Sequence, residues 1–265
     1  MNIGIALALD YKKEDILPFL NSYEKNASGT LYLITNKVEQ YNNYSKIKPI
    51  DIFDFAKQYN INLSKLTVFN LKPILFYLTL KGLKDKCTNV LLTDVDIVFQ
   101  QDPFSILEQI TTDTFIVCEE CVLYKDNDTN TTWFNAGYHE EYDNVKDKKV
   151  LNCGFAIGKY EAMFDYQKQV SKELEHILAV RPYFAYDQVI LNVLTYSRKT
   201  LNPTIIPHDT HYISHMHFLK DEDLTNYPFK DGIMYSPDNK PYIVIHQFNE
   251  NKTINDFIHK TWNNV

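Results

Sequence analysis

Near the start of the chain, two short apolar runs flank a segment whose apolar side chains recur at helical spacing. Residues 3–9 form an almost uninterrupted apolar run, which predicts a central strand covered on both faces. Residues 16–26 carry apolar positions on one helical face, and residues 31–35 predict a second strand. A strand, a helix and a strand in this order make a βαβ unit, which is typical of a nucleotide-binding α/β layer.

Similar patterns continue through the rest of the chain. We expect helices at residues 51–59, 70–83, 103–110, 161–178 and 255–262, with a further helix starting near 187. Short apolar runs predict strands from residue 89 and at 114–118, 151–158 and 241–248. Residues 124–149 are rich in Asp, Asn, Thr and Lys, and we interpret them as a flap over the site. Its aromatic residues can stack on an acceptor sugar or pin the flap to the body: Trp133, Phe134 and Tyr138.

The apolar run that starts near Asn89 ends in two carboxylates one residue apart, Asp94 and Asp96. Because side chains alternate along an extended chain, both can lie on one side while Val95 turns into the core. Oxygen ligands at this spacing suit Mn²⁺ or Mg²⁺, which keep positions free for substrate phosphates. A solvated turn is the alternative for any Asp-x-Asp, but the apolar run before the pair and the Asp-Pro stop after it favour a site.

The string from Leu92 to Phe104 resembles the DxD block of GT-A-fold nucleotide-diphospho-sugar glycosyltransferases. In that family the two acids hold a metal against the diphosphate of a nucleotide sugar. The resemblance implies a single α/β GT-A (Rossmann-like) domain over residues 1–265, with a mixed central sheet flanked by helices. Within it, residues 1–100 would form the nucleotide-binding half that ends in the DxD pair, and residues 101–265 would bind the sugar and the acceptor.

Two further blocks extend this resemblance. Lys72, within residues 70–73, resembles the basic residue that glycogenin-type transferases carry on the helix before the DxD strand, where it faces the donor. A lysine there would balance phosphate charge, although a solvated helix-end lysine is the structural alternative. The strand at residues 151–158 resembles the family's Asn-x-Gly strand, which implies that Asn152 contacts the sugar and that Gly154 shapes the floor.

Two later blocks resemble retaining members of the family. Asp187 and Gln188 stand at a helix start that, in those enzymes, points both side chains at the donor sugar. Asp is also a favoured helix N-cap, which would explain Asp187 without any catalytic role. His246 comes at the end of an apolar strand and resembles the third protein ligand of the metal.

The resemblance also places the end of the first strand beside the nucleotide base. Leu9, Asp10 and Tyr11 are therefore expected there, with Tyr11 either stacking on uracil or simply exposed in a loop. We place Val95, together with its two acidic neighbours, among the residues that contact the donor.

Histidines and cysteines outside these blocks offer little chemistry. Four histidines gather at irregular spacing and are predicted to be mostly surface groups: His208, His211, His215 and His217. Four cysteines lack the close pairs of a structural zinc site and are expected to be reduced, mostly buried thiols: Cys87, Cys118, Cys121 and Cys153.

Composition narrows the class of protein further. With 265 residues and 45% hydrophobic content, the chain can bury a sizeable core as one domain. A net charge of -7 argues against a general nucleic-acid binder, which would carry a basic face. No stretch approaches the roughly 18 apolar residues of a membrane span, and the first residues lack the basic region of a signal peptide. We therefore expect a cytoplasmic protein.

Taken together, the blocks predict a metal-dependent transferase that moves a hexose from a UDP-sugar to a glycan or another hydroxyl acceptor with retention. The resemblance implies Asp94, Asp96 and His246 as metal ligands. It also implies three catalytic residues: Asp187, Gln188 and Asn152. Two alternatives stay open: a phosphatase of the haloacid dehalogenase type, which also carries Asp-x-Asp after a strand, and a binding module without catalysis.

Overall fold

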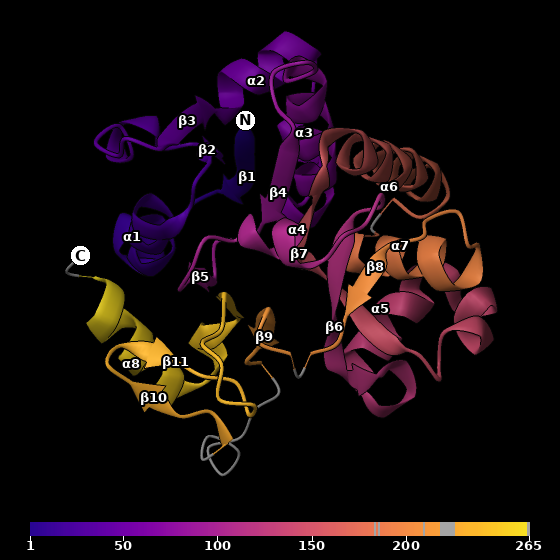
Figure 1. Cartoon of the computed structure of the whole chain (residues 1–265). Coiled ribbons are helices and arrows are strands. Elements are labelled where there is room, and N and C mark those ends of the chain that lie inside the picture. The colour runs from indigo at the N-terminus through magenta and orange to yellow at the C-terminus, as the bar shows by residue number, and fades with distance from the viewer. Residues whose placement is uncertain (183, 185, 209, 218–225, 264–265) are drawn as a thin grey trace.

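The structure is a computed structural model that describes residues 1–182, 184, 186–208, 210–217 and 226–263. A seven-stranded sheet lies at its centre in the order β3-β2-β1-β4-β7-β6-β8 (Figure 1). Its strands are β1 (Asn2–Ala8), β2 (Thr30–Thr35), β3 (Ile47–Asp51), β4 (Asn89–Thr93), β6 (Ile116–Leu123), β7 (Lys149–Lys159) and β8 (Thr204–Ile206). Only β7 runs antiparallel to its neighbours, so the expected α/β class with a mixed central sheet is confirmed.

Helices cover both faces of this sheet. Successive side chains of β1 point to opposite sides, so its apolar residues contribute to the core on each face. Ile3 and Ile5 face a core shared with α2 (Ile52–Tyr59), α3 (Val68–Gly82), α5 (Asp128–Tyr138), α6 (Tyr160–Val180) and α7 (Asp187–Asn192). Ala6 and Ala8 face the opposite core, which includes α1 (Leu17–Asn26) and α4 (Ser105–Gln109). β1 is thus buried on both sides, as its apolar run predicts.

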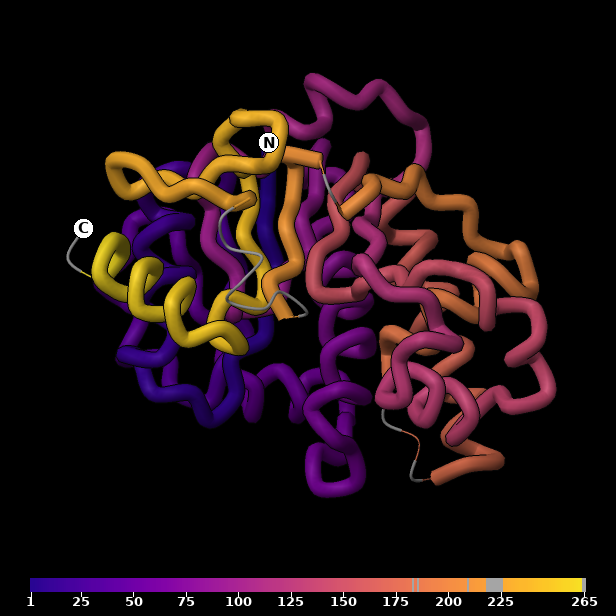
Figure 2. Tube along the Cα trace, turned by 90° about the horizontal axis from the view of Figure 1, so that it is seen from below, coloured from indigo at the N-terminus to yellow at the C-terminus, as the bar shows by residue number. Residues whose placement is uncertain are grey.

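A second, three-stranded sheet brings the C-terminal part of the chain to the central strands. Its order is β5-β12-β9, from β5 (Ile97–Phe99), β12 (Val244–His246) and β9 (Ile213–His215). A short hairpin of β10 (Phe229–Lys230) and β11 (Ile233–Met234) and the helix α8 (Lys252–Trp262) complete this part, and α8 packs on α1. Figure 2 shows the C-terminal segment lying beside the N-terminal half.

The segment at residues 124–149, which we expected to be a flap, is mostly helical and contains α5 between two short 3-10 helices, Tyr124–Asp126 and His139–Asn144. Asn127 caps α5 by accepting a 2.8 Å hydrogen bond from the backbone N–H of Asn130, and Phe134 and Tyr138 are buried one turn apart. Both aromatic side chains therefore pin the segment to the body, while Trp133 stays half-buried. The helix was not predicted, because the polar composition of the segment concealed an apolar helical face.

The structure also bears on the state of the cysteines and on membrane-spanning segments. None of the four cysteines forms a disulfide, and Cys118 is buried whereas the other three are half-buried. Throughout the described ranges, every helix is either too short or too polar to cross a lipid bilayer.

Candidate active site

The Asp-Val-Asp sequence occupies a loop at the carboxyl end of β4, next to β1. The chain runs from β1 outward to β3 and then returns to β4 on the other side of β1, so this edge is a switch point of the sheet. Backbone bonds fix the loop: Asp94 N–H donates to the carbonyl of Gly154 at 2.8 Å, and Gln247 N–H donates to that of Asp96 at 3.0 Å. Val95 is buried in the core, as expected for a side chain that turns away from the two acids.

Asp94, Asp96 and His246 converge from this loop and from the end of β12. One possible ligand atom from each residue lies within 4.8 Å of the others, and His246 Nε2 is 3.3 Å from Asp96 Oδ1. Gly154 makes this approach possible because it lacks a side chain. A Cβ there would overlap the His246 ring and would lie 2.7 Å from Asp94 Oδ2.

This group fits a divalent cation. Asp96 Oδ1 is buried and accepts no hydrogen bond from the described residues, so one carboxylate oxygen is left for a ligand. The two aspartate side chains keep about a third of their surface exposed, at 33% and 31%, which leaves a path for an ion and its phosphate ligands. Two carboxylates and one imidazole form a donor set that Mn²⁺ or Mg²⁺ accepts.

The two aspartates differ in their electrostatic surroundings. Burial raises the pKa of Asp94, an effect that Lys72 opposes and that the charge of Asp96 reinforces. Burial is the largest single influence on Asp96 and would raise its pKa, but His246, a backbone hydrogen bond and Lys72 together lower the pKa of that carboxyl below its usual value. Bringing two acids this close is unfavourable without a cation between them, which is a further reason to expect metal binding here.

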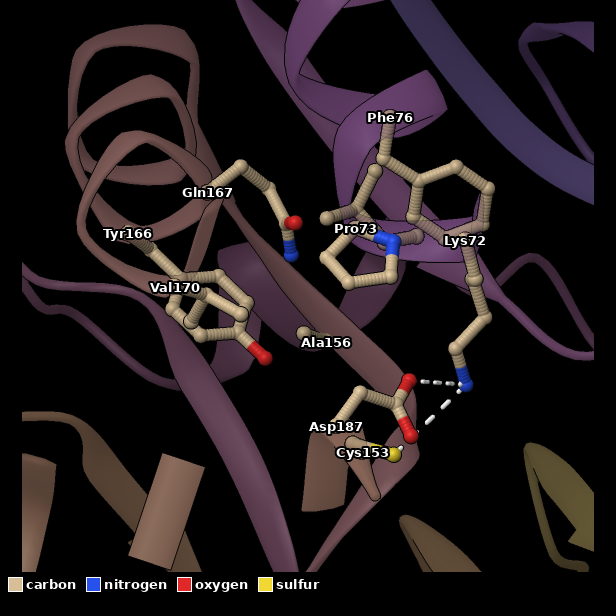
Figure 3. Close-up of a pocket in the computed structure, with 10 residues that line it drawn as sticks. Lys72, Pro73, Phe76, Cys153, Ala156, Tyr166, Gln167, Val170 and Asp187 are labelled. Atoms are coloured by element: carbon tan, nitrogen blue, oxygen red, sulfur yellow. Dashed lines mark hydrogen bonds and ion pairs between the residues drawn. The ribbon is translucent and has the colours of Figure 1, made fainter. Parts of the chain in front are cut away.

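Lys72 links the DxD loop to the start of α7. Its ammonium lies 3.0 Å from Asp94 Oδ1. On the other side it lies 2.9 Å from Asp187 Oδ2 and 3.5 Å from Cys153 Sγ (Figure 3). Burial alone would lower the pKa of Lys72, but the charges of Asp187 and Asp94 hold it well above its usual range. With only 12% of its side chain exposed, Lys72 is therefore a charged residue of the site rather than a solvated lysine.

Asp187 is the first residue of α7 and does not act as its N-cap. The N-cap position belongs to Tyr186, and no side chain caps this helix. Asp187 Oδ1 accepts a 3.0 Å bond from the Gln188 N–H, while Oδ2 pairs with Lys72. Behind this pair a cavity of about 10 Å³, the size of one water molecule, is lined mainly by apolar side chains (Figure 3).

Glu120 is a buried carboxylate of the site that the sequence did not single out. Its Oε1 accepts bonds from Asn152 Nδ2 at 2.8 Å and from Gln188 Nε2 at 3.3 Å, and its Oε2 accepts one from Asn130 Nδ2 at 3.3 Å. Because a carboxylate only accepts, it turns the NH₂ groups of all three amides toward itself. Burial raises the pKa of Glu120, and the amide bonds partly offset this. Glu120 thus fixes the orientation of two predicted catalytic residues.

Two cavities meet at the metal-binding group. One, of about 240 Å³, is lined on this side by Tyr11, Val95 and Asp96. The other, of about 120 Å³, is lined by residues from α3, β7, α7 and the site itself. Its lining consists of Phe69, Lys72, Asp94, Trp133, Asn152, Cys153, Gly154, Tyr186, Asp187, Gln188, His246 and Gln247. Of the three possible ligands, Asp96 lines the larger cavity, and Asp94 and His246 line the smaller one.

The three residues predicted to bind the nucleotide base, Leu9, Asp10 and Tyr11, have side chains in different surroundings. Tyr11 is 42% exposed at the mouth of the larger cavity, and burial followed by the charges of Asp96 and Asp94 raises its pKa. Leu9 packs against the core, and Asp10 is hydrogen-bonded to Asn36. Of the three, only Tyr11 lines that cavity.

His215 departs from the expectation that the later histidines are surface groups. It is buried on β9 and contacts His246, with the two Nδ1 atoms 2.9 Å apart. Burial and the neighbouring ring lower the pKa of His215 well below its usual range. The sequence offers only a weak signal for this position: His215 follows the apolar Ile213 by two residues, a spacing that puts both side chains on one face of a strand.

The α/β sheet, with an Asp-Val-Asp loop at its switch point and two adjoining cavities, defines a protein of the GT-A nucleotide-sugar transferase type. A family model for nucleotide-diphospho-sugar transferases matches residues 78–252, which is more than half of the chain. The chain therefore belongs to the nucleotide-diphospho-sugar transferase family and is a glycosyltransferase with a nucleotide-sugar donor. A comparison with curated proteins found no match to the chain. Tyr11 and Lys72 lie outside the matched residues, so their part in the site rests on the structure.

The close approach at Gly154 yields a first testable prediction. Gly154→Ala should weaken Mn²⁺ binding at least about tenfold, because the added methyl group must displace His246 or Asp94. Gly82→Ala is the matched control, since a Cβ there meets only the Tyr59 hydroxyl at 3.9 Å. Titration of Mn²⁺ followed by electron paramagnetic resonance compares them. Equal affinity in the two variants would contradict the proposed role of Gly154.

Proposed function

We propose that the protein transfers a hexose from a UDP-sugar to a hydroxyl acceptor, with Mn²⁺ or Mg²⁺ held by Asp94, Asp96 and His246. The observation that carries the proposal is the convergence of these three ligands between two cavities. The larger cavity, with Tyr11 at its mouth, is assigned to the nucleoside. The smaller one, which contains Asp187 and Gln188, is assigned to the sugar.

The bound cation would stabilise the negative charge that grows on the departing diphosphate. Lys72 assists because its ammonium lies 3.0 Å from Asp94 Oδ1 and its side chain lines the cavity assigned to the sugar. Glu120 holds Asn152 and Gln188 in one amide orientation, so these groups need not reorganise when the donor binds. The residues of the chain thus orient the donor and balance its charge.

We further propose that the transfer retains the configuration of the anomeric carbon. Both oxygens of Asp187 are engaged, one by Lys72 and one by the Gln188 N–H, which favours stabilising positive charge on the sugar over attacking it. In that route the bond from the anomeric carbon to the diphosphate breaks on the face where the acceptor oxygen bonds. The acceptor proton then passes to the departing phosphate oxygen.

We therefore predict that an α-linked donor gives an α-linked product. The coupling constant of the new anomeric proton, measured by NMR on the isolated product, decides the outcome. A β product would contradict both retention and the role given to Asp187.

The acceptor is proposed to be a sugar that stacks on the aromatic rim of the smaller cavity. Trp133 and Tyr186 line this rim and stack on each other with ring centroids 5.0 Å apart, and Phe69 is 53% exposed beside them. Flat aromatic faces suit the apolar face of a pyranose ring. This rim supports a glycan over an acceptor without a ring.

Trp133→Ala should raise the KM for a sugar acceptor about tenfold while leaving Mn²⁺ affinity unchanged. The reason is that Trp133 lines the cavity but donates no ligand to the metal-binding group. Phe53→Ala, which removes an exposed aromatic ring on α2, is the control. An unchanged acceptor KM in the Trp133 variant would contradict the acceptor assignment.

One assay separates the three functional classes that the sequence left open. Purified protein is mixed with Mn²⁺, a panel of nucleotide sugars and simple sugar acceptors, and both nucleoside diphosphate and inorganic phosphate are followed. A transferase releases the diphosphate and forms a glycoside, whereas a phosphatase releases phosphate. A binding module releases neither, and this result would refute the proposed activity.

A further inference from the structure

A second histidine lies directly behind the proposed metal ligand. β9 and β12 pair in parallel, and their register sets His215 opposite His246. A backbone bond of 2.9 Å from Met216 N–H to the His246 carbonyl holds the strand ends together. The two rings meet at 66° with centroids 4.9 Å apart, and their Nδ1 atoms are separated by 2.9 Å.

The geometry of His246 decides which atom carries its ring proton. Its Nε2 faces Asp96 Oδ1 at 3.3 Å and is therefore the nitrogen on the metal side. A neutral imidazole that offers one nitrogen to a metal keeps its proton on the other. The Nδ1–H of His246 then needs an acceptor, and His215 Nδ1 lies at hydrogen-bonding distance from it.

We propose that His215 is a positioning residue for His246: its Nδ1 accepts the Nδ1–H of His246 and so aims Nε2 at Asp94 and Asp96. This inference rests on the proposed metal site. A carboxylate or a backbone carbonyl commonly serves behind a metal-bound histidine, and a neutral imidazole does so here without adding charge to a site that already holds two acids. His215 then carries its own proton on Nε2.

A second observation supports a functional role over simple packing. His215 Nε2 is buried and has no hydrogen-bond partner within the part of the chain that the structure describes. Leaving a buried polar atom without a partner is unfavourable, and an apolar side chain would fill the same space without this cost. The ring is therefore better explained by what its other nitrogen does than by core packing.

The test compares side chains at position 215 that place a hydrogen-bond acceptor for His246 Nδ1–H at different positions. The oxygen of Asn can occupy the place of histidine Nδ1, whereas the oxygen of Gln lies one bond further out, and Leu has none. Mn²⁺ affinity is measured by electron paramagnetic resonance without any donor substrate. We expect His215→Leu and His215→Gln to weaken Mn²⁺ binding by about 10- to 100-fold and His215→Asn by no more than about threefold.

Two controls make the result interpretable. His176→Asn, at an exposed position on α6, should leave Mn²⁺ affinity unchanged, and thermal unfolding without metal verifies that each variant folds. Should the Leu variant fail to fold, the comparison of Asn with Gln decides alone, because both are polar. Equal affinity in the Asn and Gln variants would overturn the role of His215 while leaving the proposed function standing. Absence of Mn²⁺ binding in the natural protein would overturn the metal site and this inference together.

Discussion

Asp94→Ala and Asp96→Ala should each lower the rate of nucleoside diphosphate release by about a thousandfold or more while the protein stays folded. A loss of this size corresponds to about 4 kcal/mol, which is within what a bound cation supplies at a developing phosphate charge. The fold should survive because both side chains lie in a loop with about a third of their surface exposed, and only Val95 between them enters the core.

Calorimetric titration of Mn²⁺ with nucleoside diphosphate measures the binding step directly. Asp113→Asn is a suitable control, since its side chain is almost fully exposed and pairs only with Lys159 among the described residues. His246→Ala is expected to weaken binding less than either aspartate change, because a neutral ligand contributes less charge than a carboxylate. Undiminished Mn²⁺ binding in both aspartate variants would rule out the metal assignment.

Lys72→Met should reduce the turnover rate by about 100- to 1000-fold and also destabilise the protein. The activity falls because a positive charge beside the donor phosphates is lost. Stability falls because Asp94 and Asp187 lose their shared partner. We expect a cost of about 2 kcal/mol, below the usual range for a broken buried pair because Asp94 remains partly exposed.

The pH dependence of this destabilisation has a definite sign. Lys72 opposes the burial that raises the pKa of Asp94, so its removal raises that pKa further above the unfolded value. An acid whose pKa is raised by folding destabilises the protein above that pKa and no longer does so once the pH falls below the unfolded value of about 4. Lys72→Met should therefore differ most from the natural protein at neutral pH and least in acid.

Urea unfolding at several pH values and steady-state kinetics test both effects. Lys81→Met is the control, because it makes the same substitution of lysine by methionine at an exposed position of the same helix. Adding Asp187→Asn to Lys72→Met should recover part of the stability but none of the activity. Recovery of activity in the double variant would mean that Lys72 acts only by neutralising Asp187.

The sequence predicted the elements whose signals are local. β1 and β4 are apolar runs buried on both faces, and the DxD loop follows β4 as a change from apolar to acidic residues. His246 was expected at a strand end, and the structure places it there. These features need only the neighbouring residues to be recognised.

The parts that sequence analysis missed depend on partners distant in the chain. β5 and β9 have three residues each, and such short strands form only because each pairs with β12. Glu120 is recognisable as part of the site only through Asn152 and Gln188, which are 32 and 68 residues away. His215 is likewise recognisable as part of the site only through its contact with His246, which is 31 residues further along the chain. A single sequence does not show these contacts.

The metal dependence of donor cleavage is the most direct test of the proposed cation site at Asp94, Asp96 and His246. Nucleoside diphosphate release is followed in one sample with the donor sugar that reacts best, first with Mn²⁺, then after excess chelator, and finally after Mn²⁺ is restored. We expect release to stop with the chelator and to return with the metal. Release that continues at an unchanged rate in the chelator would contradict the proposal that Asp94, Asp96 and His246 act through a bound cation.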